Sequence, residues 1–395
     1  MRARDHGIVI GGLPPGPLNA ITDVAGVRVG HTTLIRGDGP RVVGEGPVRT
    51  GVTVVVPHDD DVFIEPVFAG CHRLNGNGEL TGLEWVRESG FLTSPVAITN
   101  THSVGVVHDA LLVHAVRAHA PHTEFWSLPV VGETYDGVLN DINGFHVRPE
   151  HLDAALSGAT GGQVAEGGVG GGTGMICHEF KGGIGTASRV VPADGGGFTV
   201  GALVQANYGW RNLLRIDGVP IGEAIPTSEV PSPWDAADAL AAARGGGTST
   251  LAPGSGSIIV VLATDAPLLP HQCERLAQRA GLGIARMGGI GSNGSGDIFI
   301  AFATGNRGLP GPEPRKGPGA PISHAVRMLD DGRITPLFQA AVEAVEEAIV
   351  NALLVAETMT GADGITAYGL DGERVVEIMA RHGRGPKARP GGAAA

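Results

Sequence analysis

The segment Ser257–Thr264, with the sequence SIIVVLAT, constrains the fold of this chain more than any other feature. A strand with one face in water alternates apolar and polar residues, whereas a strand covered on both faces is continuously apolar. After its serine this segment is apolar almost without interruption, which predicts a strand with protein on both sides. The chain is therefore expected to form a layered structure around that strand.

Other segments predict further strands and helices around it. Short β-branched runs bounded by turn residues predict strands over Val27–Gly30, Val52–Pro57, Val96–Thr99, Thr199–Ala206 and Asp297–Ala303. Apolar residues at helical spacing predict helices over Ser103–Ala120, Pro270–Ala280 and Thr335–Met359. On the last of these, Glu343, Glu346 and Glu347 lie opposite the apolar stripe. Strands mixed with helices and followed by a long helix favour a layered α/β or α+β domain over a doubly wound sheet.

Composition and charge narrow the class of protein. Hydrophobic residues make up 42% of the 395 residues, which is enough for a sizeable core, and a net charge of −12 gives no electrostatic footprint for nucleic acid or an anionic membrane. No uninterrupted apolar stretch of about 18 residues exists, and Met1–Leu18 lacks the apolar segment of a signal peptide. Cys71, Cys177 and Cys273 show no C-x-x-C spacing, so they predict core residues of a cytoplasmic protein.

Neither a metal nor a cofactor is expected. The histidines His108, His114 and His119 of one predicted helix lack a matching set of carboxylates. A G-x-G-x-x-G motif at Gly289–Gly294 follows a helix and precedes a strand, which is the reverse of the dinucleotide-binding order. The P-loop, H-E-x-x-H and G-x-S-x-G motifs are absent. A hydrolase on this chain must therefore activate its nucleophile in some other way.

The sequence just before the central strand suggests how a nucleophile could be activated. A glycine-rich loop, Gly245–Gly256, leads directly into Ser257 and places a hydroxyl at the first position of the strand. This arrangement is expected of a self-cleaving N-terminal nucleophile, in which the Ser257 hydroxyl attacks the Gly256 carbonyl and water releases the resulting ester. The freed α-amine, with a pKa of about 7.7–8.0, can then act as the general base for its own hydroxyl. Spacing alone leaves open an ordinary Gly/Ser loop before a core strand.

Seven segments resemble one family in family order across nearly the whole chain. They are NAITDVAGVRVGHTTL (19–34), TGLEWVRESG (81–90), VGETYDGVLND (131–141), GGTGMICHEFKGGIGTASR (171–189), LVQANYG (203–209), GSIIVVLATDAPLLPHQ (256–272) and NGSGDIFIAFATGN (293–306). The family is that of the self-processing N-terminal-serine aminopeptidases, which includes L-aminopeptidase/D-esterase and the β-aminopeptidases. The resemblance implies a four-layer αββα sandwich, similar to N-terminal nucleophile hydrolases but with different connectivity.

The resemblance also implies how the chain is divided. A single domain over residues 1–383 would be cut into chains 1–256 and 257–395 that stay together, commonly as a tetramer of such pairs. Residues 384–395 are rich in Pro, Gly and Ala and predict a disordered tail.

Catalytic roles follow from the same resemblance. Ser257 matches the nucleophile, and Ser295 and Asp297 match the pair that hydrogen-bonds to its amine and hydroxyl. Spaced two apart at a strand start, that pair should point to one side. Asn207 matches the oxyanion-hole asparagine. The β-aminopeptidases of the family carry Glu at the position of Asp297, so the resemblance implies lower activity on β-peptides.

We also expect specific roles for three further residues. Tyr135 matches a tyrosine near the acyl intermediate, and Glu133 matches a carboxylate suited to the ammonium of the substrate. Lys181 is expected to play a structural part by pairing with a carboxylate.

The expected function is a cofactor-free aminopeptidase or amidase that acts on small peptides, amides or esters through an acyl-enzyme on Ser257. Two alternatives are an endo-acting amidase of the nylon-oligomer hydrolase type and an acyltransferase of the ornithine acetyltransferase type. Both of those use threonine as the nucleophile, which counts against them. A third alternative is a binding or structural protein in which Ser257 is inert.

Overall fold

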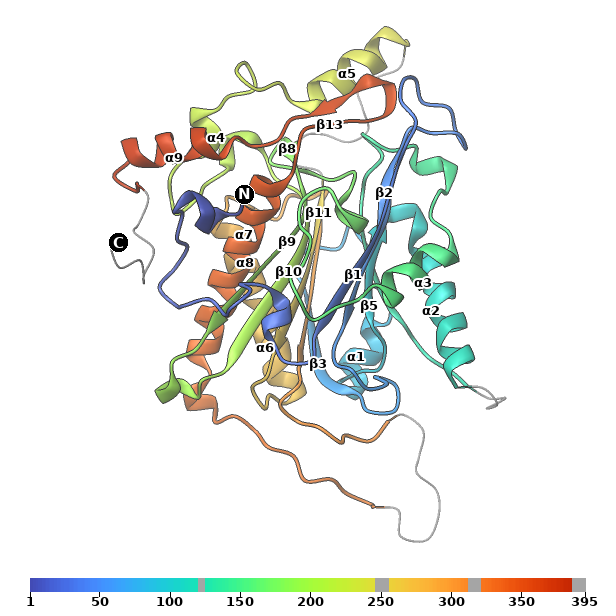
Figure 1. Cartoon of the computed structure of the whole chain (residues 1–395), viewed down its shortest axis with the longest axis vertical. Coiled ribbons are helices and arrows are strands. Elements are labelled where there is room, and N and C mark those ends of the chain that lie inside the picture. Colours follow the sequence, from blue (N-terminus) through green and yellow to red (C-terminus); the bar gives the residue numbers. More distant parts are fainter. Residues whose placement is uncertain (120–124, 246–255, 312–320, 386–395) are drawn as a thin grey trace.

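The computed structural model describes residues 1–119, 125–245, 256–311 and 321–385. Two β-sheets pack face to face at its centre, and helices cover the outer face of each sheet (Figure 1). The layers therefore run helix, sheet, sheet, helix, and the predicted αββα sandwich is confirmed. Residues 386–395 of the predicted tail and residues 246–255 of the predicted glycine-rich loop lie outside the described residues.

The larger sheet contains the segment from which the fold was predicted. Its six strands lie in the order β4-β3-β12-β11-β10-β9. Their bounds are Phe91–Leu92 for β4, Val67–Arg73 for β3, Gly296–Ala303 for β12, Ser257–Thr264 for β11, Thr199–Asn207 for β10 and Gly183–Val190 for β9. The central strand β11 runs antiparallel to β10 and parallel to β12. All eight of its residues are buried, as its apolar sequence predicts.

The smaller sheet has four strands in the order β1-β2-β5-β6. Their bounds are Arg28–Arg36 for β1, Val48–Val56 for β2, Val96–Asn100 for β5 and Val130–Thr134 for β6. Helices α2 (Val104–Ala118) and α3 (Pro149–Ser157) cover its outer face. Short apolar runs at β1, β2 and β5 were sufficient to predict these strands, although β1 extends further than predicted.

Alternation along the strands of the larger sheet separates two cores. Ile258 and Val260 of β11 pack toward the helices, whereas Ile259 and Val261 pack between the two sheets. The inter-sheet core also receives Ile98 and other apolar residues of the smaller sheet. Each position on β11 and β12 can therefore be assigned to the helix-facing or the inter-sheet side, which matters for the site below.

Helices α6 (Pro270–Gln278), α7 (Ala280–Arg286) and α8 (Thr335–Val355) cover the outer face of the larger sheet. The glutamates opposite the apolar stripe of α8 do not face water as on an ordinary amphipathic helix, because Glu343, Glu346 and Glu347 are all buried. Arg189 of β9 lies between two of them, 3.3 Å from Glu343 and 2.6 Å from Glu347. The N-terminal segment supplies Arg4, 2.8 Å from Glu347. The burial of α8 on all sides therefore rests on ion pairs that sequence periodicity does not reveal.

Shorter elements complete the chain. They are α1 (Leu83–Ser89), β7 (Ile176–Cys177), β8 (Phe180–Lys181), α4 (Ile221–Ala224), α5 (Pro233–Ala243), β13 (Met359–Thr360), β14 (Thr366–Ala367) and α9 (Gly372–Arg381). The three cysteines are buried and unpaired, so their prediction as core residues is confirmed. In the described part of the chain, no helix has the length and apolar character needed to cross a membrane.

Candidate active site

Ser257 is the first residue of β11 and is flanked by strands on both sides. Its partner on β10 is Asn207, the last residue of that strand, and its partner on β12 is Gly296, the first residue. The side chains of Ser257 and Asn207 share the inter-sheet face, because they alternate with Ile258 and Ala206 of the helix-facing core. The structure therefore brings together the predicted nucleophile and the predicted oxyanion donor.

The peptide before Ser257 is held closely by both neighbouring strands. The Gly296 amide donates a hydrogen bond to the Gly256 carbonyl oxygen over 3.0 Å. A Cβ atom at residue 256 would lie only 2.0 Å from the Asn207 carbonyl oxygen, so only glycine fits there. The carbonyl that self-cleavage requires is thus fixed, polarised by an N–H donor and adjacent to the Ser257 hydroxyl.

Asn207 is oriented by hydrogen bonds at both ends of its amide. The Ile176 backbone N–H donates to Asn207 Oδ1 over 2.8 Å, and Asn207 Nδ2 donates to the Tyr135 carbonyl oxygen over 3.0 Å. The oxygen and nitrogen of the amide are therefore distinguished by their partners. A primary amide carries two N–H donors, and the Tyr135 contact uses one of them. The second is available for a developing oxyanion.

Ser295 and Asp297 form a pair on the other face of the sheet. Ser295 Oγ donates to Asp297 Oδ1 over 2.6 Å, so the two side chains do point to one side. Asp297 pairs with Ile258 across the β11–β12 ladder and shares the helix-facing side with it. Burial raises the pKa of Asp297, and hydrogen bonds from Ser295 and Asn75 oppose that rise. Alternation along β11 and β12 therefore assigns this pair and the Ser257 side chain to opposite faces of the sheet.

Asn75 is a site residue that the sequence did not indicate. It lies in the loop after β3, and its Oδ1 accepts the Asp297 backbone N–H over 2.7 Å, while its Nδ2 donates to the Ser292 carbonyl oxygen over 3.0 Å. No local motif marks this asparagine, because its partners are more than 200 positions away in the sequence. The quoted family segments also omit it. Only the pairing of β3 with β12 brings it to the site.

Glu133 lies on β6 of the smaller sheet and is buried. Its carboxylate accepts hydrogen bonds from the Glu79 backbone N–H, over 3.0 Å, and from the Thr101 hydroxyl. Burial raises its pKa, and these two hydrogen bonds counteract the rise. Gly78 stands between Glu133 and the start of β12, since a Cβ there would lie 3.1 Å from Glu133 Oε1 and 3.0 Å from Gly296 Cα.

Tyr135 follows β6 and is half-buried, with a pKa raised by burial. Its backbone carbonyl reaches Asn207, as described above, and its hydroxyl lies against Gly137, where a Cβ would come within 2.3 Å of the oxygen. The backbone of Tyr135 therefore contacts Asn207, while its side chain lies against Gly137.

A hollow of about 420 Å³ opens next to Gly78. Arg73, Glu79, Trp85 and Ile298 are among the residues that line it. Arg73 and Ile298 are register partners and share the inter-sheet face with Ser257. This hollow opens on the same face of the sheet as Ser257, although Ser257, Asn207 and Glu133 are not among the residues that line it.

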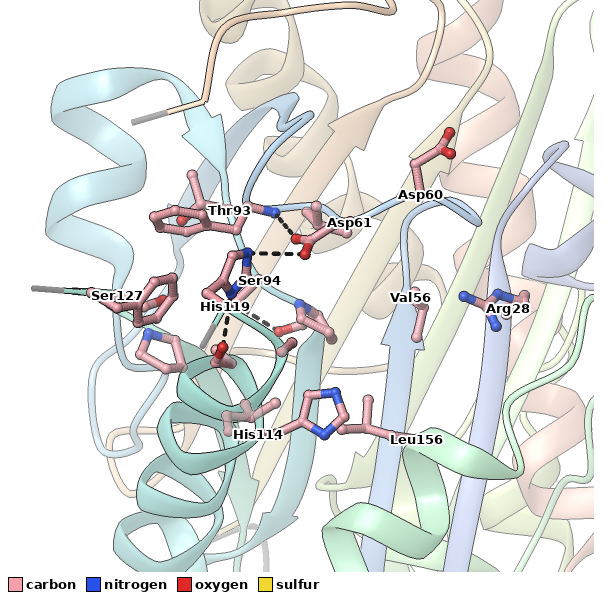
Figure 2. A pocket seen from close by; sticks show the side chains of 18 of the residues that line it. Arg28, Val56, Asp60, Asp61, Thr93, Ser94, His114, His119, Ser127 and Leu156 are labelled. Atoms are coloured by element: carbon pink, nitrogen blue, oxygen red, sulfur yellow. Dashed lines mark hydrogen bonds and ion pairs between the residues drawn. The ribbon is translucent and has the colours of Figure 1, made fainter. Parts of the chain in front are cut away.

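A second hollow, of about 400 Å³, lies away from these residues between α2 and the loop after β2. Figure 2 shows His119, which follows α2, directed at Asp61, with 3.0 Å between Nε2 and the carboxylate. His114 lies 3.6 Å from Asp153. These histidines therefore have carboxylate neighbours only in pairs, and within the described ranges no three His, Cys, Asp or Glu side chains are grouped to hold a metal.

The prediction that Lys181 pairs with a carboxylate is wrong. Its side chain is fully buried on β8, and its Nζ donates to three backbone carbonyl oxygens, those of Gly172, Met175 and Gly182. Within the part of the chain that the structure describes, no acidic side chain forms an ion pair with it. Peptide dipoles take the place of the expected counter-charge.

Solved structures share this architecture along the whole chain. A β-aminopeptidase from Burkholderia sp. is 52% identical, with a TM-score of 0.86, and covers 99% of this chain and 100% of its own. The L-aminopeptidase D-Ala-esterase/amidase from Ochrobactrum anthropi is 45% identical, with a TM-score of 0.83, over 97% of this chain and 99% of its own. That enzyme is described as a prototype of the serine aminopeptidases and a variant of the Ntn hydrolase fold. The fold and site thus define a hydrolase with an N-terminal nucleophile.

Sequence comparison places the chain within this class. The model of peptidase family S58 matches residues 19–367. The β-peptidyl aminopeptidase BapA of Sphingosinicella microcystinivorans is 50% identical over 383 residues, covering 97% of this chain and 93% of the relative. The chain belongs to peptidase family S58, and it is an aminopeptidase. The nylon-oligomer hydrolase and acyltransferase alternatives are not favoured by any of these relatives.

Proposed function

We propose that the chain cleaves itself between Gly256 and Ser257, and that the new N-terminal Ser257 then releases N-terminal residues from small peptides, amides and esters. One observation carries this proposal. Ser257 begins a buried strand with Asn207 on one side and Gly296 on the other, and the Gly256 carbonyl before it accepts the Gly296 amide.

Self-cleavage would proceed by an N-to-O acyl shift. Ser257 Oγ attacks the Gly256 carbonyl carbon, and the Gly296 N–H stabilises the charge that develops on the carbonyl oxygen. The C–N bond breaks, the nitrogen takes the hydroxyl proton, and an ester joins the two residues. Water then hydrolyses the ester, leaving a carboxylate on Gly256 and a free amine and hydroxyl on Ser257.

The division of the site across the sheet suits the cleaved enzyme. The hydroxyl of Ser257 faces the inter-sheet side, where substrate binds, whereas its α-amine is a backbone group in the plane of the sheet. Asp297 and Ser295 reach that plane from the helix-facing side, next to the Ile258 backbone. We infer that they orient the amine, which accepts the hydroxyl proton during attack. The separation therefore favours a contact with the amine over one with the hydroxyl.

The acyl steps would use the inter-sheet residues. Attack by Ser257 Oγ on the substrate carbonyl places negative charge where the second N–H of Asn207 can donate, an interaction worth about 2.7–4 kcal/mol in comparable enzymes. Tyr135 would lie near the acyl group. Glu133 would bind the ammonium of the substrate, since a buried carboxylate forms a strong charge-assisted hydrogen bond. Water finally resolves the acyl-enzyme.

Two observations bear on which N-terminal residue the enzyme prefers, and they point to different substrate classes. Asp297 stands where the family resemblance puts Glu in β-aminopeptidases, which favours α-residues. The relatives named above include β-peptidyl enzymes at 50% and 52% identity and an L-aminopeptidase at 45%. We propose that both substrate classes are hydrolysed, with α-residues preferred.

Assembly and location extend the same proposal. We propose that the two chains associate as a tetramer of such pairs, on the strength of the family resemblance. A cytoplasmic location is supported by three buried cysteines that form no disulfide.

A substrate panel tests the proposed function. Amino-acid amides and p-nitroanilides with L-, D- and β-residues are incubated with the wild-type protein and with Ser257→Ala. Hydrolysis by the wild type alone supports the proposal. Equal hydrolysis by Ser257→Ala would remove Ser257 from the mechanism.

A further inference from the structure

Lys181 is a buried cation that the proposed mechanism does not use. Its Nζ donates to the carbonyl oxygens of Gly182 at 2.7 Å, Met175 at 3.0 Å and Gly172 at 3.3 Å. The side chain has no exposed surface. Three acceptors match the three N–H donors of an ammonium, whereas a neutral amine has only two.

Such a side chain is costly to bury. Burial lowers the pKa of Lys181 to about 7. A buried charge without an acidic partner is rare and is destabilising unless its hydrogen bonds compensate. If the side chain at this position only filled space, an apolar residue of similar volume would stabilise the fold at least as well. The arrangement of its acceptors indicates what the charge does instead.

One of the three acceptors leads directly to the oxyanion asparagine. Met175 supplies the carbonyl and Ile176 the N–H of a single peptide group. Its oxygen accepts from Lys181, and its N–H donates to Asn207 Oδ1 over 2.8 Å. A cation on the oxygen of an amide withdraws electron density and strengthens its N–H as a donor. Successive hydrogen bonds of this kind polarise one another, by about 10–30% per bond.

We propose that Lys181 is a positioning residue of the active site, which orients and polarises Asn207 through the Met175–Ile176 peptide group so that its Nδ2 stabilises the oxyanion. This inference rests on the proposed function of Ser257 and Asn207. The polarisation is transmitted through a continuous row of groups. These are the Lys181 ammonium, the carbonyl and N–H of the Met175–Ile176 peptide, and the carbonyl and N–H of the Asn207 side chain. Lys181 itself touches no substrate.

The test is a double-mutant cycle on the full-length protein, with kcat expressed per cleaved chain and an amino-acid p-nitroanilide as substrate. Asn207→Ala should lower kcat by about 10²–10³-fold, as loss of an oxyanion donor does elsewhere. Lys181→Met should lower kcat by about 10-fold or more with KM changed less than about twofold, because the contact strengthens in the transition state. In the double variant, Lys181→Met should add less than about threefold to the loss in Asn207→Ala.

Several results would overturn the inference. Independent, multiplicative losses in the double variant would show that Lys181 does not act through Asn207. A rise in KM with unchanged kcat would assign it to binding. If Lys181→Met does not fold, Lys181→Gln replaces it in the cycle. If neither variant folds, the role of Lys181 is structural and the inference is wrong.

Controls separate this inference from the proposed function. Cys177→Ala lies on the same hairpin and should keep the wild-type kcat. If Ser257→Ala or Asn207→Ala stays fully active, the proposed function is wrong. If both lose activity and Lys181→Met does not, only the inference about Lys181 is wrong.

Discussion

At the scale of single residues, the sheet separates the two roles that we propose for Ser257, that of nucleophile for its hydroxyl and that of general base for its α-amine. The hydroxyl of Ser257 belongs to the inter-sheet face, with Asn207 beside it, and Asp297 belongs to the opposite face. A side chain cannot reach both faces, but the terminal amine of a strand can be approached from either. An N-terminal nucleophile is therefore well suited to this position.

The first prediction concerns Asp297 and pH. The negative charge of Asp297 favours the protonated form of the Ser257 amine and raises the pKa of that amine. Asp297→Asn should therefore lower the rate and shift the rising limb of the pH–rate profile to lower pH. Steady-state rates measured from pH 5 to 10 check this, and coincident profiles for the variant and the parent would argue against the amine as base.

The second prediction concerns Glu133 and substrate charge. Glu133→Gln removes the carboxylate that would bind the substrate ammonium. KM for free-amine substrates should rise by about 10-fold or more, in keeping with a charge-assisted hydrogen bond worth about 1.5–3 kcal/mol. N-acylated esters should be nearly unaffected. Equal losses for the two substrate types would show that Glu133 supports the fold and does not bind the amine.

The sequence predicted some of these residues and not others for a physical reason. Ser257 and Asn207 lie on apolar strands with recognisable segments, so both their position and their neighbours could be anticipated. Asn75 and the acceptors of Lys181 depend on contacts between distant loops and strands, which no local pattern encodes. The prediction of a carboxylate partner for Lys181 is wrong because three peptide carbonyl oxygens accept the hydrogen bonds of its ammonium group.

At the scale of elements, periodicity predicted the strands and the positions of the helices well, but it did not reveal that the glutamate face of α8 is buried. A helix with glutamates opposite its apolar stripe is normally exposed on that side. Here Arg189 and Arg4 cover the glutamates, and Asn19 donates to Glu347 as well. Both arginines lie far from α8 in the sequence, so the polar face could not be recognised as buried.

The third prediction follows from this ion pair. Burial alone would raise the pKa of Glu347, but Arg189, Arg4 and Asn19 outweigh it and hold the pKa below its ordinary value. Glu347→Gln removes the shorter of the two ion pairs of buried Arg189 and leaves Glu343 as its remaining carboxylate, so it should lower the free energy of unfolding by about 1.5–3 kcal/mol at pH 7. Denaturant unfolding of the inactive Ser257→Ala protein measures this without self-cleavage.

The same pair predicts a pH dependence and has a matched control. A carboxylate with a lowered folded-state pKa stabilises above its unfolded-state pKa of about 4.3, and loses that contribution as pH falls through the folded value. The effect of Glu347→Gln should therefore be full at pH 7 and shrink below pH 4. Glu229→Gln removes an exposed partner of Arg374 and should change stability by less than about 1 kcal/mol. Equal effects of the two variants would show that the buried pair is not a main support of α8.

At the scale of the whole molecule, cleavage between Gly256 and Ser257 would divide the chain without dividing the fold. Strand β11 of the second chain pairs with β10 of the first along its full length, and β12 pairs with β3. Helix α8 of the second chain packs against β9 and β10 of the first. The two chains should therefore elute together from a sizing column under native conditions and separate only in denaturant. Elution as two separate chains would contradict this pairing.

The central claim is that Ser257 becomes the N-terminal nucleophile, and the most direct measurement is intact mass with N-terminal sequencing of the purified protein. The 40.2 kDa chain should appear as two chains of roughly 26 and 14 kDa by proportion, the smaller beginning Ser-Ile-Ile-Val. Ser257→Ala should remain one chain and hydrolyse nothing. A different N-terminus on the smaller chain, or full activity in an uncleaved protein, would contradict the assignment.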